Sequence, residues 1–118
     1  MVIDKKTKFG GINITLEAIG AVAGSAATEC YGVVGLAAKN SLRENIANLL
    51  KEDAYYKGVI PHKDKDDYSV DLYIIVAYGV KITEVVSEVQ KKVKYVLEKT
   101  FDIKFKAVNV FVQGLKTI

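Results

Sequence analysis

Residues 12–36, INITLEAIGAVAGSAATECYGVVGL, decide the fold of this chain. The alternation of Ile12 and Ile14 predicts a strand, and Thr15 is placed to cap a helix that follows it. In that helix, apolar residues recur at steps of three and four and form one stripe: Leu16, Ile19, Ala23, Ala26 or Ala27, and Cys30. Gly32 is placed to end the helix, and residues 33–36 follow as a short strand or turn.

The other faces of this helix are also built from small residues, with charge only at Glu17 and Glu29. Gly20 and Gly24 each cost about 1 kcal/mol in a helix interior, so close packing must offset that cost. The helix is therefore expected to contact protein on more than one side. Its candidate protein-contact residues are Ala21, Gly24, Ser25 and Thr28.

The middle of the chain predicts a second helix and a hairpin. Residues 41–44 (SLRE) form a capping box, and the helix they begin is expected to run to about Lys51. Residues 57–63 and 68–78 read as two arms of a hairpin. Pro61 makes the first arm an edge strand, because proline cannot donate to a ladder.

The last part of the chain predicts a long helix and a strand. Residues 82–101 are amphipathic, with apolar residues along one side and lysine and glutamate along the other. In the strand at 103–112 the apolar positions change from odd to even numbers, so a β-bulge or a bend is expected near Ala107. The element order is β-α-(β)-α-β-β-α-β. It predicts a small single-domain α+β two-layer sandwich, with helices on one face of a mixed or antiparallel sheet.

Length and composition indicate one globular domain. The chain has 118 residues and a net charge of +3. Residues 1–8 are expected to be a flexible N-terminus, and residues 9–118 to form the domain. The modest charge argues against a nucleic-acid partner, and the single cysteine fits a reducing cytosol. Because no apolar run reaches the roughly 18 residues of a membrane span, a cytoplasmic location is expected.

No combination of residues predicts a catalytic or metal site. Cys30 and His62 are the only thiol and the only imidazole, and no pattern indicates that they lie together as nucleophile and base. The aspartates of residues 64–71 lack the glycine and the bidentate glutamate of a calcium-binding EF-hand loop. One cysteine and one histidine cannot supply a four-ligand zinc site. We therefore expect no catalytic residue, no cofactor and no metal.

The segment from Gly32 to Gly35 leaves an alternative open. Its GxxG spacing is that of the KH loop that holds an RNA backbone, and Lys39 and Arg43 follow it closely. Valines at its two middle positions favour a helix stop that leads into a buried strand, because phosphate contacts need polar side chains. A KH-like RNA-binding module is thus an alternative function. A small-molecule sensor with a pocket between helix and sheet is a second.

The strand at 68–78 has one face that supplies the core and another that is harder to assign. Tyr73, Ile75 and Ala77 lie on this second face. If the helices cover only the first face, these residues form an exposed apolar strip of the kind that marks protein contacts. Otherwise a loop or the early strand covers them. They are the second set of candidate contact residues.

The order and spacing of these motifs resemble the alkaline shock protein family, that is, alkaline shock protein twenty-three and its relatives. ITLEAIGAVAG with ATECYGVVGL resembles the first half of the family, and the chain from SVDLYIIVAYGV to VNVFVQGL resembles the second. The resemblance covers residues 9–115. The matching positions are Gly32, Val33, Tyr78, Gly79, Gln90, Val108, Asn109, Val110, Gln113 and Gly114. Where the family often has a glycine after the long helix, this chain has Phe101 and Asp102.

The resemblance implies a non-enzymatic, cytoplasmic bacterial protein of envelope stress and homeostasis, mainly in Gram-positive lineages. Some members are held near the membrane by a separate anchoring protein. Short members tend to be encoded beside a fatty-acid kinase or a dihydroxyacetone-kinase-like protein. With no catalytic pattern in the residues, this predicts a scaffold or adaptor that forms homo-oligomers and binds a protein partner.

Overall fold

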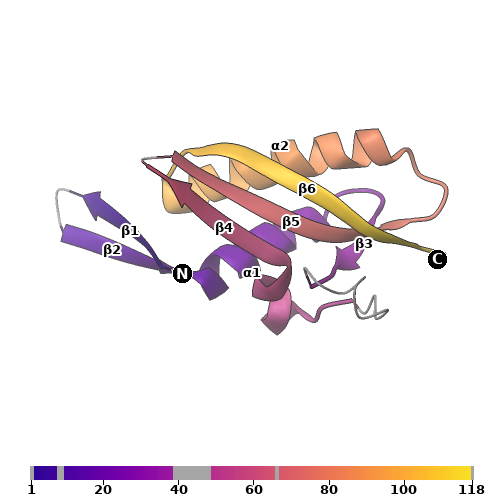
Figure 1. The fold of residues 1–118 in the computed structure, drawn as a ribbon, viewed down its shortest axis with the longest axis horizontal. Coiled ribbons are helices and arrows are strands. Elements are labelled where there is room, and N and C mark those ends of the chain that lie inside the picture. Colours follow the sequence, from indigo (N-terminus) through magenta and orange to yellow (C-terminus); the bar gives the residue numbers. More distant parts are fainter. Residues whose placement is uncertain (1, 8–9, 39–48, 66, 118) are drawn as a thin grey trace.

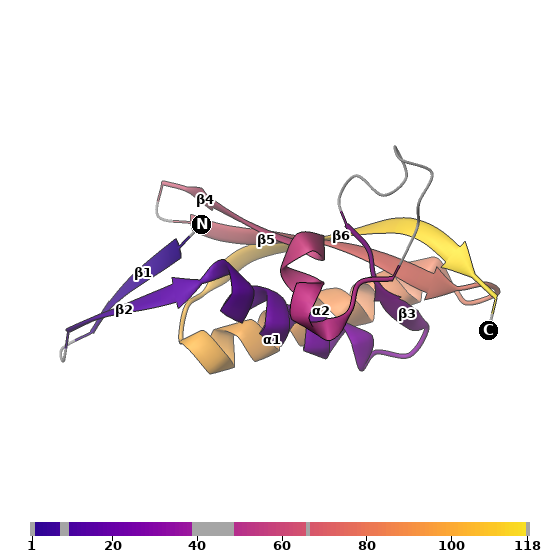
Figure 2. The same ribbon diagram turned by 90° about the horizontal axis from the view of Figure 1, so that it is seen from below.

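The structure, a computed structural model, describes residues 2–7, 10–38, 49–65 and 67–117. It has a sheet layer and a helix layer, and Figure 2 shows both long helices on the same face of the sheet. The elements, in chain order, are β1 (Val2–Thr7), β2 (Gly10–Thr15), α1 (Leu16–Thr28), β3 (Val33–Leu36), the 3-10 helix η1 (Glu52–Gly58), β4 (Val59–Asp64), β5 (Asp67–Ala77), α2 (Ile82–Phe101) and β6 (Phe105–Lys116) (Figure 1).

The main sheet is mixed and built around β5. β4 pairs antiparallel with the first half of β5 and β3 with the second half, so these two strands follow each other along one edge of β5. β6 pairs with β5 in parallel and occupies its other edge. β4 and β5 are the predicted hairpin, and Pro61 lies in β4. The prediction of an α+β two-layer fold with helices on one face of the sheet is confirmed.

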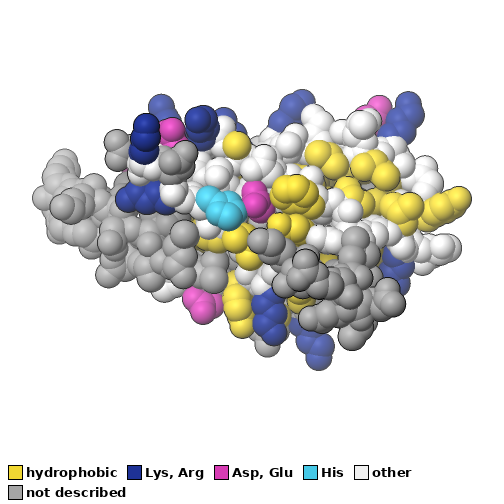
Figure 3. All heavy atoms as spheres, in the orientation of Figure 1, with side chains coloured by type: hydrophobic (Ala, Val, Ile, Leu, Met, Phe, Trp, Pro, Cys, Tyr) yellow, Lys and Arg dark blue, Asp and Glu magenta, His cyan; other side chains and the backbone are white. Residues whose placement is uncertain are grey.

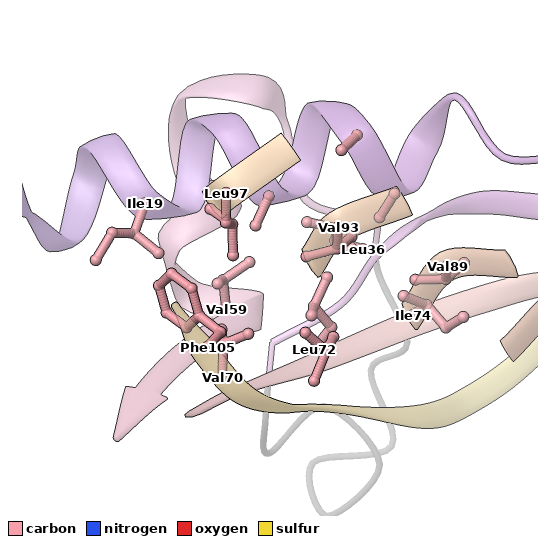
Figure 4. Close-up of a cluster of buried hydrophobic side chains, with 14 of the residues drawn as sticks. Ile19, Leu36, Val59, Val70, Leu72, Ile74, Val89, Val93, Leu97 and Phe105 are labelled. Atoms are coloured by element: carbon pink, nitrogen blue, oxygen red, sulfur yellow. The ribbon is translucent and has the colours of Figure 1, made fainter. Parts of the chain in front are cut away.

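The hydrophobic core lies between this sheet and the two helices. β5 contributes Val70, Leu72, Ile74 and Val76, and each of these side chains is fully buried. Figure 4 shows the cluster in which they meet the helices, and the members that it labels are Ile19, Leu36, Val59, Val70, Leu72, Ile74, Val89, Val93, Leu97 and Phe105. Alternation in β5 and helical periodicity in α2 predict these inward positions, because both are local backbone geometries.

The small residues of α1 serve packing within this chain. The helix begins at the Thr15 cap, whose hydroxyl accepts from the Ala18 N–H at 3.2 Å. A Cβ atom on Gly20 would lie 2.6 Å from the Cα of Tyr56, and one on Gly24 would lie 2.3 Å from the ring of Tyr55. The glycines thus let η1 approach α1, and the sheet and α2 contact other sides of the helix, while the side that carries Ala21 and Ser25 stays exposed. The prediction of contacts on more than one side is confirmed.

Two segments differ from the predictions. No strand was predicted within residues 1–8, where β1 pairs along its whole length with β2 in a hairpin that projects from the domain (Figure 1). The predicted helix at 41–51 lies mostly outside the described residues, and its last three residues are not helical. The Leu50 N–H instead donates to the Leu36 carbonyl at 2.8 Å, which ties this segment to the end of β3. η1 was not predicted.

The long helix and the last strand follow the predictions closely. α2 spans the predicted residues and is followed by Asp102, which adopts a left-handed φ of +54° where the family often has glycine. The register of β6 on β5 shifts between Phe105 and Ala107, which confirms the predicted bulge. A second shift, between Val112 and Gly114, and the extension of β6 to Lys116 were not predicted.

Candidate protein-contact surfaces

The first candidate surface, on α1, is only partly available to a partner. Ala21 and Ser25 are exposed and line a shallow hollow of about 340 Å³ between α1 and α2. Thr28 is half-buried, and its hydroxyl donates to the Ser25 carbonyl at 3.0 Å. Gly24 is buried on the η1 side, beneath Tyr55, so its assignment to a partner contact is wrong.

The second candidate set is buried within this chain. Tyr73, Ile75 and Ala77 are only 7%, 2% and 8% exposed, so they form no exposed strip, and of the two interpretations the one in which other segments cover them holds. The ring of Phe111 stacks on Tyr73, with centroids 5.0 Å apart and planes 16° apart. Leu49, from the segment before η1, lies over Gly35, which pairs with Ile75. Neighbouring strand and loop side chains therefore cover this row.

The same face of the sheet nevertheless presents apolar side chains to solvent. Phe111 is 45% exposed, and Leu49 and Ile60 are half-buried. We call this surface the outer-face patch. It consists of Phe111, Leu49 and Ile60, with Tyr73 and Ile75 beneath them. Figure 3 views this face and shows hydrophobic side chains gathered beside a histidine and an acidic side chain.

A polar network of three strands borders the patch. Asp71 on β5 receives two contacts: its Oδ2 lies 2.8 Å from His62 Nε2 on β4, and its Oδ1 accepts from Asn109 Nδ2 on β6 at 2.9 Å. Burial, and next the Asp71 carboxylate, raise the pKa of the Tyr73 hydroxyl. An apolar centre with a fixed polar border is the composition of many protein interfaces.

Phe111 and Asn109 were missed as site residues, although the sequence contains the signal that places them. The inward positions Val108, Val110 and Val112 are even-numbered. Alternation therefore sends the odd-numbered Asn109 and Phe111 to the opposite face. The pairing of β6 with β5 then places them beside Asp71 and Tyr73.

The segment from Gly32 to Gly35 does not form an exposed RNA-binding loop. Gly32 has a φ of +88°, and a Cβ atom there would lie 2.7 Å from a methyl group of Val85. Gly35 is buried within β3, under Leu49. α1 ends at Thr28 with Glu29 as its C-cap, so the prediction that Gly32 ends the helix is wrong, and Gly32 instead belongs to the turn that leads into β3. The predicted strand at residues 33–36 is confirmed. Lys39 and Arg43, the basic residues of the RNA alternative, lie outside the described residues.

A hollow of about 540 Å³ lies where the turn after α1 meets the start of α2. Burial raises the pKa of the Cys30 thiol, which donates to the Ala26 carbonyl at 3.6 Å. Lys92 opposes that shift while its ammonium binds Glu29 at 2.8 Å. The hollow is lined by Cys30, Tyr31, Gly79, Val80, Lys81, Glu84, Val85, Glu88 and Lys92.

Cys30 and His62 lie on opposite sides of the sheet and form no catalytic pair. Cys30 follows α1 in the helix layer, whereas His62 lies on the outer face with Asp71. In the described residues, no group of three or more His, Cys, Asp or Glu side chains could hold a metal ion. Across the same residues, no helix is long and apolar enough to cross a membrane.

Alkylation of Cys30 by iodoacetamide at about pH 8 is expected to be slower than alkylation of the urea-unfolded chain. The raised pKa leaves less thiolate at a given pH, and only the thiolate reacts. Lys92→Ala should slow the reaction further, and Glu88→Gln should speed it, because Lys92 lowers the pKa and Glu88 raises it. Mass spectrometry over a pH series measures these rates. Equal rates for folded and unfolded chains across the series would contradict the expectation.

Comparisons with known proteins identify the family. A sequence profile of the alkaline shock protein twenty-three family, described by a cell envelope-related function, matches residues 4–117. The uncharacterized protein YloU of Bacillus subtilis is 41% identical over 116 residues, which cover 98% of this chain and 97% of its own. The uncharacterized protein Spy1614 of Streptococcus pyogenes is 39% identical over 118 residues, covering 100% and 98%. No solved structure shows significant similarity. This chain belongs to the alkaline shock protein twenty-three family, whose described function is related to the cell envelope.

Proposed function

We propose that this protein is a non-enzymatic scaffold or adaptor of the bacterial envelope stress response, and that it self-associates through the outer-face patch. The observation that carries the proposal is Phe111, which is 45% exposed yet held by stacking on the buried Tyr73. A ring that is already held in place loses little conformational freedom when a partner covers it. Both long helices lie on the other face of the sheet, and none of the described helices covers the ring of Phe111 on this one (Figure 2).

A second copy of this chain is the partner that the patch fits. In a two-fold contact the same surface meets itself, so each copy would place its Phe111 against the patch of the other. The ionisable pair His62–Asp71 lies at the border and not at the centre, so such a contact would bury little charge. This arrangement favours an apolar interface that tolerates high salt.

Location and other partners complete the proposal. The family supports a cytoplasmic protein whose membrane contact, where it has one, is made through a separate anchoring protein. A functional link to a fatty-acid or dihydroxyacetone-type kinase belongs to the same proposal. These statements rest on the family and on no particular surface of this chain.

Phe111→Arg is expected to convert the oligomer into a monomer and to leave the domain folded. A buried interface cannot accommodate an unpaired guanidinium, whereas the half-exposed position in the monomer can. Light scattering on size-exclusion eluate, at several concentrations and at low and high salt, measures the mass. Circular dichroism checks the fold.

Tyr31→Arg is the matched control, because Tyr31 is 87% exposed and lies outside the patch. A monomeric wild-type protein at every micromolar concentration would overturn self-association. If Phe111→Arg leaves the oligomer intact and Tyr31→Arg dissociates it, the interface lies elsewhere.

A further inference from the structure

We infer that the open edge of β6 binds an extended acidic segment of a partner protein and adds it to the sheet as a further strand. This inference rests on the adaptor role and names the chemistry of the partner. It uses a surface other than the outer-face patch, so the two can be tested separately. The argument combines a basic groove with an unpaired strand edge.

The groove lies between α2 and β6 and has a volume of about 320 Å³. Lys91 and Lys94 come from α2 and Lys106 from β6, and none of the described residues that line the groove carries a carboxylate. The groove residues are Gln90, Lys91, Lys94, Lys106, Ala107, Val108 and Asn109. Lys106 lies 3.7 Å from Asp67, and both side chains are largely exposed, so this ion pair is weak and open to exchange for another carboxylate.

The strand edge beside the groove offers unpaired backbone groups. β5 occupies one edge of β6, and Gln90 Nε2 donates to the Val108 carbonyl at 3.0 Å on the other. Because backbone groups of alternate residues point to the same edge, those of Val110 and Val112 point to this edge as well. In the described chain, no strand pairs there. Such a row of donors and acceptors is a template for another strand.

The charges next to this edge select an acidic strand. Residues 103–118 contain Lys104, Lys106 and Lys116 and no aspartate or glutamate. The nearby Glu98 on α2 is already engaged, because its carboxylate accepts from the Phe105 N–H at 2.9 Å. RNA and anionic lipid could satisfy the lysines, but neither would use the backbone edge. The lysines and the unpaired backbone edge together therefore favour a polypeptide with carboxylate side chains.

A peptide that alternates glutamate and valine over 12 residues, the length of β6, is a suitable probe. Fluorescence anisotropy is expected to show binding that weakens as salt rises, whereas the matching lysine–valine peptide does not bind. The double variant Lys91→Glu/Lys94→Glu should weaken binding by about tenfold or more. The control Lys51→Glu/Lys57→Glu makes the same charge change beside and within η1 and should leave the affinity unchanged.

Amide exchange measured by NMR tests strand addition directly. The peptide should slow exchange at Val110 and Val112, whereas the Phe111 amide, which points toward β5, should change little. Binding without protection of these two amides would overturn the inference, and so would equal binding of the lysine–valine peptide. Polyuridylate or anionic vesicles that bind more tightly, with the same dependence on Lys91 and Lys94, would overturn it in favour of a nucleic acid or a membrane.

Measuring the oligomer of each variant separates this inference from the proposed self-association. Lys91→Glu/Lys94→Glu should keep the wild-type mass, and Phe111→Arg should still bind the acidic peptide. If no peptide binds while Phe111→Arg dissociates the oligomer, the edge inference fails and self-association stands.

Discussion

Gly24→Ala is expected to lower the free energy of unfolding by about 3 kcal/mol. In a free helix the same change would stabilise by about 1 kcal/mol, because alanine has the higher helix propensity. In this fold the new Cβ would lie 2.3 and 2.6 Å from two ring atoms of Tyr55, and 2.9 Å from a methyl group of Leu36. Either η1 or the ring must move. Urea unfolding followed by circular dichroism measures the loss.

A double-mutant cycle shows whether the Tyr55 ring is the obstacle. Gly24→Ala combined with Tyr55→Ala should lose clearly less stability than the sum of the two single losses, because the second change removes the atoms that the first one meets. Gly20→Ala is the contrast, since its Cβ would lie 2.6 and 2.7 Å from backbone atoms of Tyr56. Truncating the Tyr56 side chain should not rescue that variant. Additive losses for the Gly24 and Tyr55 pair would contradict this packing.

The same packing decides which substitutions can test association. Gly24 and Tyr73 belong to the two sets of candidate contact residues, so arginine at either position is an obvious test of association. Both positions are buried in the chain, so arginine at either should unfold it. Only exposed positions such as Phe111 can separate association from folding.

Local patterns predicted the core because they depend only on backbone geometry. Leu72 and Ile74 follow from alternation in one strand, and Val89 and Val93 follow from the period of one helix. The close packing of α1 also followed from its glycines. The segment that packs against these glycines, η1, could not be predicted. It is short, has no periodic signal and lies more than twenty residues along the chain from Gly24.

The contact surfaces depend on pairings between distant segments, which single-strand patterns do not contain. Tyr73 is covered because β6 returns in parallel beside β5 and brings Phe111 over it. Lys91 and Lys94 look like the solvated face of an ordinary amphipathic helix. They become the wall of a groove only when β6 lies beside α2. The placement of β6 beside β5 and α2 is therefore the information that local sequence patterns do not contain.

Phe105→Ala and Phe111→Ala test that register through stability. In a regular strand, two residues six positions apart lie on the same face and should cost similar amounts on truncation. The bulge between Phe105 and Ala107 reverses the phase, so that Phe105 points into the core, 1% exposed, and Phe111 points outward.

Phe105→Ala is therefore expected to cost about 3–5 kcal/mol. Its ring contacts Tyr68 at a centroid distance of 6.3 Å and packs within the buried cluster of Figure 4. Phe111→Ala should cost about 1 kcal/mol or less at a protein concentration where the chain is monomeric, since only the stacking on Tyr73 and part of its burial are lost. Urea unfolding of the two variants under identical conditions gives the comparison. Similar losses would mean that both rings share one face, which would remove the bulge, the outer position of Phe111 and with it the basis of the outer-face patch.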